Sequence, residues 1–359
     1  MEERLNVILN QFRLDAPAVD CAAHGCGHIN ATYLVTTASG RRYILQKIND
    51  HIFRDVPALM RNIRLVTDHL HRQSDDPRCA MTIIQTNDGA DFLASDGFWR
   101  VYDYVEHSLC LQSPENDADF LESARAFGAF QQQLKDFPAG ELAETIPNFH
   151  NTPDRFRIFR ETLKKDPMGR AKEVAREIDF LMEREEKLGM LQGMRDCGDL
   201  PTRVTHNDTK LNNVLLDNDT RRALCVIDLD TVMPGLTAYD FGDSIRFGAA
   251  TAAEDEPDPS KMKLDLHLFE IYTKGFLEAA RSLTDREVQM MPMGALIMTL
   301  EVGMRFLTDY LEGDLYFKTA YPEHNLVRSR TQLALVADMQ DKWEEMNRIV
   351  ADVARQVRG

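Results

Sequence analysis

Residues 204–217 read V-T-H-N-D-T-K-L-N-N-V-L-L-D and place a cluster of polar side chains between two short apolar runs. The flanking runs are rich in valine and leucine, which is typical of short buried strands. A loop that is fixed by a strand at each end can hold its side chains in defined directions. The stretch therefore predicts a functional site rather than an ordinary turn.

The polar residues of this loop match the requirements of phosphoryl transfer. Transfer to a hydroxyl group needs a carboxylate that accepts the proton, oxygen ligands for Mg²⁺ and positive charge near the γ-phosphate. The spacing His206-x-Asp208-x4-Asn213 matches a kinase catalytic loop, with Lys210 two residues after the aspartate. Downstream, V-I-D-L-D puts Asp228 at the end of a predicted strand. The pattern predicts Asp208 as catalytic base, Lys210 as catalytic cation, and Asn213 and Asp228 as metal ligands.

Two other interpretations are open at this point. Taken singly, Asp208 and Asn213 are ordinary turn residues and His206 is an ordinary core histidine. A metallohydrolase would use His206 with the aspartates, but no second histidine lies at ligand spacing. A strand-bounded loop followed by two aspartates at a strand end favours the kinase interpretation.

The first hundred residues are predicted to form strands and one helix. Two β-rich runs, Ala31–Thr36 and Arg42–Ile48, flank T-A-S-G and predict a hairpin. Apolar residues at helical spacing predict a helix over 56–70. Further strands are expected at Thr82–Gln85 and Trp99–Val105.

Helices are expected to dominate after about residue 115. Apolar stripes at helical spacing run over 120–134 and 174–188. The quoted loop belongs to a small β island, which consists of Arg203–Thr205, Val214–Leu216 and Leu224–Ile227. A single last helix is expected to carry Val336, Met339, Trp343, Met346, Val350 and Val353. This spacing indicates a core-facing helix or, alternatively, a dimer seam, so a monomer or weak dimer is expected.

These elements predict an α+β, kinase-like fold with two lobes. Residues 1–105 would form a small, β-rich lobe that binds the nucleotide, and residues 106–359 would form a larger, mainly helical lobe. Hydrophobic residues make up 43% of the 359, which is enough to build both cores.

Composition narrows the partners and the location. The net charge of -16 opposes nucleic-acid binding. No apolar run reaches the roughly 18 residues that a membrane span needs, and Met-Glu-Glu-Arg-Leu does not begin like a signal peptide, so a cytoplasmic protein is expected. The six cysteines form no C-x-x-C pair, so zinc is not expected.

The motif H-N-D-x4-N followed by I-D-L-D resembles the aminoglycoside phosphotransferase/choline kinase family, which combines the protein-kinase fold with small-molecule acceptors. Longer strings resemble the branch of that family that phosphorylates N-acetylhexosamines. They are G-H-I-N-A-T-Y-L-V-T-T (27–37), R-Y-I-L-Q-K-I-N (42–49), D-F-G-D-S-I-R-F-G-A (240–249) and G-M-R-F-L-T-D-Y-L-E-G-D-L-Y-F (303–317). The resemblance extends over nearly the full length.

The resemblance implies that ATP with Mg²⁺ donates the phosphoryl group and that the C1 hydroxyl of N-acetylglucosamine or N-acetylgalactosamine accepts it. It implies acceptor contacts from Arg305 and Tyr316, and also from His28 and Asp230, although Asp230 alternatively assists the metal. Without the resemblance, Arg305 reads as a helix-surface ion pair and Tyr316 as a buried tyrosine. Another acceptor (a different sugar, choline, homoserine or an aminoglycoside) and a non-catalytic protein of the same fold are the alternatives.

On the nucleotide side, G-H-I-N-A-T at 27–32 takes the place of a glycine-rich loop but has a single glycine. The resemblance assigns Gly27, Asn30 and Thr32 to ATP. Backbone groups around Tyr104 and Val105 would contact adenine.

The phosphate anchor of the nucleotide side departs from the kinase pattern. Lys47 lies on the strand where kinases have a phosphate-binding lysine, although Gln46 competes for the inward position because neighbouring strand residues face opposite sides. No glutamate is present in the helix at 56–71 to pair with the lysine.

Two residues near the site are expected to be structural. Asp240 begins D-F-G, but it follows Asp228 by twelve residues and a Pro-Gly turn, so a loop brace or helix cap is the better interpretation. His206 is expected to brace the catalytic loop rather than to take part in the reaction.

Overall fold

The structure is a computed structural model that describes residues 3–25 and 29–359. Its contacts divide the chain into two compact units. The first comprises Met1–Leu109, Asp136–Pro147 and Leu215–Met233. The second comprises Cys110–Lys135, Asn148–Val214 and Pro234–Gly359. Asp228 therefore belongs to the first unit and Asp208 to the second.

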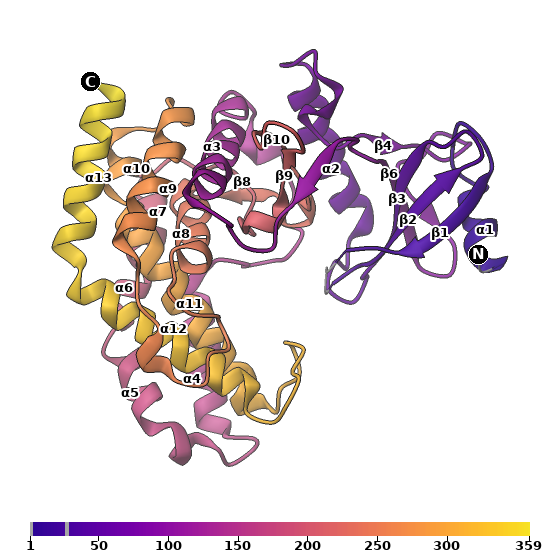
Figure 1. The fold of residues 1–359 in the computed structure, drawn as a ribbon. Coiled ribbons are helices and arrows are strands. Elements are labelled where there is room, and N and C mark those ends of the chain that lie inside the picture. The colour runs from indigo at the N-terminus through magenta and orange to yellow at the C-terminus, as the bar shows by residue number, and fades with distance from the viewer. Residues whose placement is uncertain (1–2, 26–28) are drawn as a thin grey trace. The chain divides into compact units, whose positions relative to one another are not determined.

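The first unit is built on an antiparallel sheet with the order β1-β2-β3-β6-β4, and β5 pairs with β6 (Figure 1). Its strands are β1 (Ala18–Ala23), β2 (Ala31–Thr37), β3 (Arg42–Ile48), β4 (Ile83–Ile84), β5 (Leu93–Ala94) and β6 (Phe98–Asp103). The predicted hairpin is confirmed as β2 and β3. The strand expected over Thr82–Gln85 is shorter than predicted, and β6 begins and ends earlier than Trp99–Val105.

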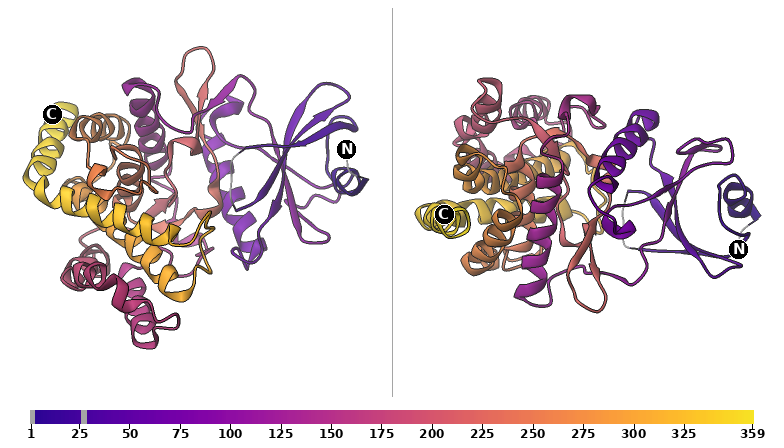
Figure 2. Two further views of the ribbon diagram at one scale, coloured as in Figure 1. Left: turned by 60° about the horizontal axis from the view of Figure 1, so that its bottom comes forward. Right: turned by 90° about the horizontal axis from the view of Figure 1, so that it is seen from above.

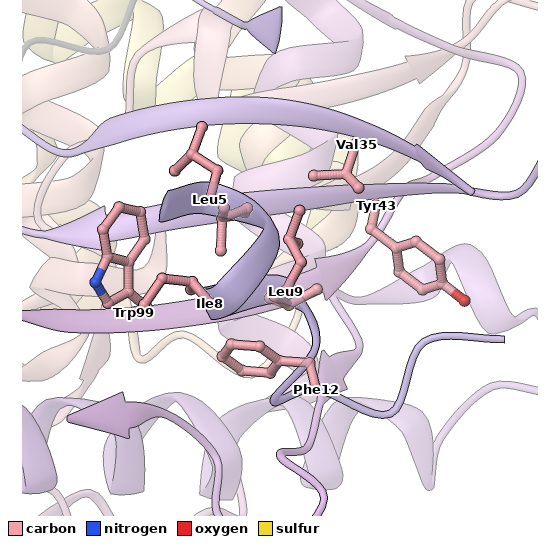
Figure 3. Close-up of a cluster of buried hydrophobic side chains, with 9 residues drawn as sticks. Leu5, Ile8, Leu9, Phe12, Val35, Tyr43 and Trp99 are labelled. Atoms are coloured by element: carbon pink, nitrogen blue, oxygen red, sulfur yellow. The ribbon is translucent and has the colours of Figure 1, made fainter. Parts of the chain in front are cut away.

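A hydrophobic core lies between one face of this sheet and helix α1 (Glu3–Leu9). Figure 3 shows Leu5, Ile8 and Leu9 of the helix pointing toward Val35, Tyr43 and Trp99 of the strands. These side chains alternate along each strand with residues of the opposite face, as the pleat of a strand requires.

Helix α2 (Val56–His71) confirms the predicted helix, and it begins where the sequence provides a cap. The Asp55 carboxylate accepts a hydrogen bond from the backbone N–H of Ala58 at 2.9 Å, and Pro57 lies in the first turn. The helix contacts the second face of the sheet, because Met60 Sδ lies 3.9 Å from Arg100 Nη1 in β6.

Two small sheets complete the strands. One has the order β10-β9-β7, with β7 (Ser108–Cys110), β9 (Val214–Asp217) and β10 (Ala223–Val226), and the other pairs β8 (Arg203–Thr205) with β11 (Met233–Gly235). The predicted β island is confirmed by β8, β9 and β10.

The second unit is mainly helical. Its helices are α3 (Asp117–Gln133), α4 (Thr152–Lys165), α5 (Ala175–Met182), α6 (Glu185–Leu188), α7 (Met190–Asp196), α8 (Thr237–Gly248), α9 (Leu266–Ala279), α10 (Asp285–Gln289), α11 (Met291–Glu312), α12 (His324–Asp341) and α13 (Trp343–Arg358). Helix α9 packs along α3, while α8 and α12 pack along the long, largely buried α11 (Figures 1 and 2). The expected α+β class is confirmed.

Two helix predictions were wrong in their boundaries. The last apolar stripe is divided between α12 and α13, because Lys342 leaves the helical conformation (φ -95°, ψ 12°) and its backbone N–H closes the end of α12. Met339 on α12 and Met346 on α13 are nevertheless both buried, so the stripe marked core positions correctly. The stripe over 174–188 is likewise divided between a 3₁₀ turn, α5 and α6.

Candidate active site

The loop between β8 and β9 brings three predicted site residues together within the second unit. Lys210 Nζ lies 2.9 Å from Asp208 Oδ1. Asn213 Nδ2 donates to the backbone oxygen of Asp208 at 2.8 Å and to its Oδ2 at 3.0 Å. Both carboxylate oxygens of Asp208 therefore have a fixed partner, which orients the group.

The charges of this pair reinforce each other. Burial acts to raise the pKa of Asp208, but the Lys210 ammonium and its hydrogen bond outweigh burial and lower the pKa below its ordinary value. Asp208 in turn raises the pKa of Lys210 above its ordinary value, despite burial. Asp208 is therefore a carboxylate and Lys210 an ammonium at neutral pH.

Asp240 in α8 braces the backbone of this loop. Its Oδ2 accepts from the backbone N–H of His206 at 2.9 Å and its Oδ1 from that of Asn207 at 2.8 Å. Gln131 of α3 donates to Asp240 Oδ2 at 2.8 Å. Asn207 has a φ of 65°, a conformation that needs such support in a residue other than glycine. The predicted structural role of Asp240 is confirmed, as a brace rather than a cap.

The residues that follow Asp240 extend the brace to Thr209. The backbone N–H of Thr209 donates to Asp243 Oδ2 at 3.0 Å, and its hydroxyl donates to the backbone oxygen of Asp240 at 2.6 Å. Asp243 is itself held by Arg246 at 2.9 Å, and both side chains are buried. The D-F-G-D segment thus holds the loop through three backbone N–H groups, those of residues 206, 207 and 209.

His206 confirms its predicted role as a loop brace. Its side chain is buried, and its ring lies edge-on to Phe127 and Phe130 of α3. Its Nδ1 accepts from the backbone N–H of Asp208 at 3.2 Å.

A cationic and aromatic cluster lies in the same unit, where Arg155 of α4 and Arg305 of α11 meet aromatic rings from the segments that precede α4 and follow α11. The Arg305 guanidinium lies over the rings of Phe149, Tyr316 and Phe317 at 5.2, 5.8 and 5.6 Å from their centres. Arg155 of α4 donates from Nη2 to the backbone oxygen of Phe149 at 3.1 Å. Burial, followed by repulsion from Arg305, lowers the pKa of Arg155. The predicted acceptor residues Arg305 and Tyr316 are therefore neighbours.

One buried carboxylate accompanies these arginines. Glu301 bonds His150 Nδ1 at 2.8 Å and accepts from the Thr152 hydroxyl at 2.5 Å, whereas Arg305 Nη1 is 3.9 Å away. Because the Glu301 carboxylate lies closer to His150 and Thr152 than to Arg305, it neutralises the Arg305 charge only partly. His150 Nε2 lies 3.5 Å from the backbone oxygen of Asn207, which links the cluster to the catalytic loop.

The loop that carries Tyr316 is held by a second buried carboxylate, Asp309. It accepts from three successive backbone N–H groups, those of Leu315, Tyr316 and Phe317, at 2.9, 2.7 and 2.9 Å. Asn325 of α12 donates to the same carboxylate at 2.9 Å. Tyr316 itself is 57% exposed, which contradicts the alternative of a buried tyrosine.

In the first unit, the predicted residues Asn30 and Asp230 bond each other directly, and Asp230 also pairs with a residue that the sequence interpretation missed. Arg100 of β6 donates from Nη1 to Asp230 Oδ1 at 2.5 Å and from Nη2 to Oδ2 at 2.9 Å. Asn30 Nδ2 donates to Asp230 Oδ2 at 2.6 Å. The pair is almost fully buried. A lone arginine within the apolar and aromatic run F-W-R-V-Y was the available signal for it.

The same network places Gln46 rather than Lys47 beside Arg100. Gln46 Oε1 accepts from Arg100 Nε at 2.9 Å, and Gln46 Nε2 donates to the Thr32 hydroxyl at 3.0 Å. Lys47 pairs with Trp99 in the sheet, and its ammonium lies 5.6 Å from the Trp99 ring centre on the opposite face. The buried ion pair on this face is thus formed by Arg100 of β6 and Asp230, instead of the lysine and glutamate of the kinase pattern.

The segment expected to contact adenine, at Tyr104 and Val105, makes local hydrogen bonds. The backbone N–H of Tyr104 donates to Arg42 O at 3.2 Å, and Val105 O accepts from the Ser108 hydroxyl at 2.6 Å. Gly27 and His28 lie outside the described residues.

The chemistry of Asn213 and Asp228 fits Mg²⁺, which prefers oxygen ligands. The amide nitrogen of Asn213 makes both bonds to Asp208, so its Oδ1 is the atom available to a metal. Asp228 follows β10 with a left-handed conformation (φ 60°, ψ 55°). Within residues 3–25 and 29–359, no group of three or more His, Cys, Asp and Glu side chains is arranged to hold a metal ion.

Comparison with known proteins shows the family of this chain. Residues 20–269 match the family model of the phosphotransferase enzyme family (APH), and because this is more than half of the chain, the chain belongs to that family. It is therefore a phosphotransferase.

Solved structures support the fold. The microcompartment-associated aminopropanol kinase is similar with a TM-score of 0.60 at 16% identity, covering 96% of this chain and 98% of that chain. Choline kinase from Cryptosporidium parvum Iowa II has a TM-score of 0.60 at 14% identity, with 93% and 92% covered. An amicoumacin kinase in complex with AMP-PNP and Ca²⁺ has a TM-score of 0.56 at 13% identity, with 93% of each chain covered. The predicted kinase-like fold is confirmed.

No helix among the described residues is both long and apolar enough to span a membrane.

Proposed function

We propose that this chain is an N-acetylhexosamine 1-kinase, which transfers the γ-phosphoryl group of ATP to the C1 hydroxyl of N-acetylglucosamine or N-acetylgalactosamine in a Mg²⁺-dependent reaction. The observation that carries the kinase assignment is the Asp208 carboxylate, which is held by Lys210 and Asn213 on a loop braced by Asp240. Such a carboxylate is fixed in direction and ionised before any substrate binds. Both properties suit a group that receives a proton from a hydroxyl.

In the proposed reaction, the C1 hydroxyl loses its proton to the Asp208 carboxylate as its oxygen bonds to the γ-phosphorus. The bond from that phosphorus to the bridging oxygen breaks, and ADP leaves. Lys210 supplies positive charge to the transferring group. Asn213 and Asp228 would hold Mg²⁺, which neutralises charge on the phosphates.

The cluster around Arg305 supports a neutral acceptor rather than a cationic one. Two guanidinium groups, of Arg155 and Arg305, share one partly committed carboxylate, Glu301, so an ammonium group placed beside them would be repelled. A sugar instead offers hydroxyl and acetamido oxygens to the guanidinium donors and an apolar ring face to Tyr316. His28 is a further acceptor contact in this proposal, whereas the Asp230 carboxylate is already bonded to Arg100 and Asn30 and is no longer assigned to the sugar.

For the nucleotide, we assign Asn30 and Thr32, together with Gly27, to the phosphate side. The sequence-based assignment of Lys47 to the phosphates is not kept, because its ammonium lies over the Trp99 ring, on the face of the sheet opposite Gln46 and Arg100. Backbone groups of Tyr104 and Val105 would contact adenine. The side-chain hydrogen bonds that Asn30 and Thr32 already make, to Asp230 and Gln46, would hold the start of β2 in place for the nucleotide.

A panel of acceptors tests this function. Purified protein is incubated with Mg·ATP and one acceptor at a time: N-acetylglucosamine, N-acetylgalactosamine, glucose, glucosamine, choline, homoserine or kanamycin. ADP release is measured, and the product is examined by phosphorus NMR. We expect turnover with both N-acetylhexosamines, a 1-phosphate product, and little turnover with acceptors that carry an ammonium group.

The outcomes separate the levels of the proposal. A 6-phosphate product would contradict the assigned hydroxyl and leave the sugar kinase in place. Preferential turnover of choline or kanamycin would contradict the acceptor class. Absence of ADP release with the whole panel would contradict the proposed activity altogether.

A further inference from the structure

Arg100 and Asp230 of the first unit form an ion pair that is almost fully buried. Their side chains are 1% and 5% exposed, and the guanidinium contacts both carboxylate oxygens in a forked geometry. The two residues are 130 positions apart in the sequence. The pair thus ties β6 of the sheet to the 3₁₀ turn Leu229–Thr231.

Neighbouring groups tie the same turn at several more points. Asn30 bonds the Asp230 carboxylate and also accepts from the backbone N–H of Asn49 at 3.0 Å. The Thr145 hydroxyl donates to the Asp230 backbone oxygen at 3.0 Å, and Asn62 donates to that of Val232 at 3.1 Å. The segment from 230 to 232 is therefore anchored through its side chain and its backbone.

Asp228 lies two residues before this anchored segment. Asp228 has a φ of 60°, an unfavourable conformation for a residue other than glycine, and such a conformation persists only where its surroundings impose it. A buried ion pair is a poor device for stability alone, because desolvation cancels much of the attraction. Its particular contribution is geometric, since the planar guanidinium fixes both the distance and the orientation of the carboxylate.

We propose that Arg100 is a positioning residue, which through Asp230 sets the conformation of Asp228 and so the affinity for Mg·nucleotide. The proposal rests on the proposed function for its metal and nucleotide, but not on the identity of the acceptor. It assigns the Asp230 carboxylate to Arg100 and Asn30, in place of the contact with the sugar expected from the sequence.

Three variants separate positioning from simple stabilisation: Arg100→Met, Arg100→Lys and the double variant Arg100→Met with Asp230→Asn. Melting temperature is measured for each, and binding of Mg·AMP-PNP is measured by calorimetry without acceptor. A further double variant, Arg64→Met with Asp91→Asn, is the control, because this partly buried pair of the same unit lies outside the proposed machinery.

We expect Arg100→Met to lower the melting temperature by about 5–15 °C, because it leaves a buried carboxylate without its cation. The double variant removes that charge and should recover much of the loss. Its affinity for Mg·AMP-PNP should nevertheless stay at least about tenfold below wild type, and Arg100→Lys, which keeps the charge but not the fork, should lose about tenfold as well. The control should bind Mg·AMP-PNP like wild type.

Recovery of both stability and nucleotide affinity in the double variant would overturn the proposal, as would wild-type affinity in Arg100→Lys. Failure of the wild type to phosphorylate N-acetylhexosamines, with its Mg·AMP-PNP binding intact and lost in the double variant, would contradict the proposed acceptor and still support the role of Arg100.

Discussion

Asp208 is the residue on which the proposed activity depends most directly. Replacement by asparagine keeps the size of the side chain and one oxygen, but removes the charge and the ability to accept a proton. We expect Asp208→Asn to lower kcat by roughly 10²–10⁴, the usual range for a lost general base, with a small change in the KM for ATP. ADP release with N-acetylglucosamine measures both constants.

The control for this variant is Asp219→Asn, which changes an exposed carboxylate on the turn between β9 and β10. It should leave kcat unchanged. If Asp208→Asn turned over at nearly the wild-type rate, the base would have to be another group.

At the scale of elements, Asp309 holds the conformation of the loop that follows α11. Its carboxylate accepts hydrogen bonds from three successive backbone N–H groups, which form a small anion-binding concavity at residues 315–317. Asp309→Asn puts an amide nitrogen against these donors, so we expect the loop to open. Hydrogen exchange should become faster at residues 315–317, and the KM for the sugar should rise at least several-fold while the KM for ATP stays the same.

Asp341→Asn, at the exposed end of α12, is the control for this loop. Unchanged exchange at 315–317 in Asp309→Asn would show that the carboxylate does not hold the loop. Faster exchange without a change in the KM for the sugar would separate the loop from acceptor binding.

Helices α8 and α11 approach each other at two glycines. A Cβ at Gly242 would lie 2.3 Å from the backbone oxygen of Gly294, and one at Gly294 would lie 2.2 Å from that of Ala238. Because backbone atoms cannot rotate away, Gly242→Ala and Gly294→Ala should each reduce the free energy of unfolding by about 1–3 kcal/mol. Urea unfolding followed by circular dichroism measures this.

Gly193 in the exposed part of α7 is the matched control, since a Cβ there meets no atom within 4 Å. Gly193→Ala should raise the free energy of unfolding by up to about 1 kcal/mol through helix propensity. Equal effects at all three glycines would contradict the close-contact explanation.

At the scale of the whole molecule, the proposed ligand should stabilise the native state. Binding of Mg·AMP-PNP at 100 times its dissociation constant adds about 2.7 kcal/mol, which raises the melting temperature by several degrees. Asp228→Asn should abolish the part of this shift that depends on Mg²⁺, and so should EDTA added to the wild type. Differential scanning fluorimetry measures the shifts.

Asp258→Asn in the exposed loop before α9 should keep the full shift. A Mg²⁺-dependent shift that survives in Asp228→Asn would place the metal ligand elsewhere.

The sequence predicted the parts of the site that depend on short spacing. Asp208, Lys210 and Asn213 lie within six residues, and a loop bounded by strands leaves them few arrangements, so the pattern was sufficient to bring them together. The structural role of Asp240 also followed, because its distance along the chain from Asp228 excluded Asp240 as the metal ligand of the kinase pattern.

The ends of helices were less predictable. The break at Lys342 interrupts an apolar stripe that continues across it, and periodicity does not detect a local departure in φ and ψ.

Local pattern was thus sufficient for the fold class, the hairpin of β2 and β3, α2, and the grouping of Asp208, Lys210 and Asn213. It was insufficient for the partners of buried charges. Arg100 meets Asp230 across 130 residues, Glu301 meets His150 across 151, and both pairings depend on how separate segments pack. No spacing rule connects such residues, because burial forces a charge to find a partner but does not say where in the chain that partner is. Only tertiary contacts made that choice.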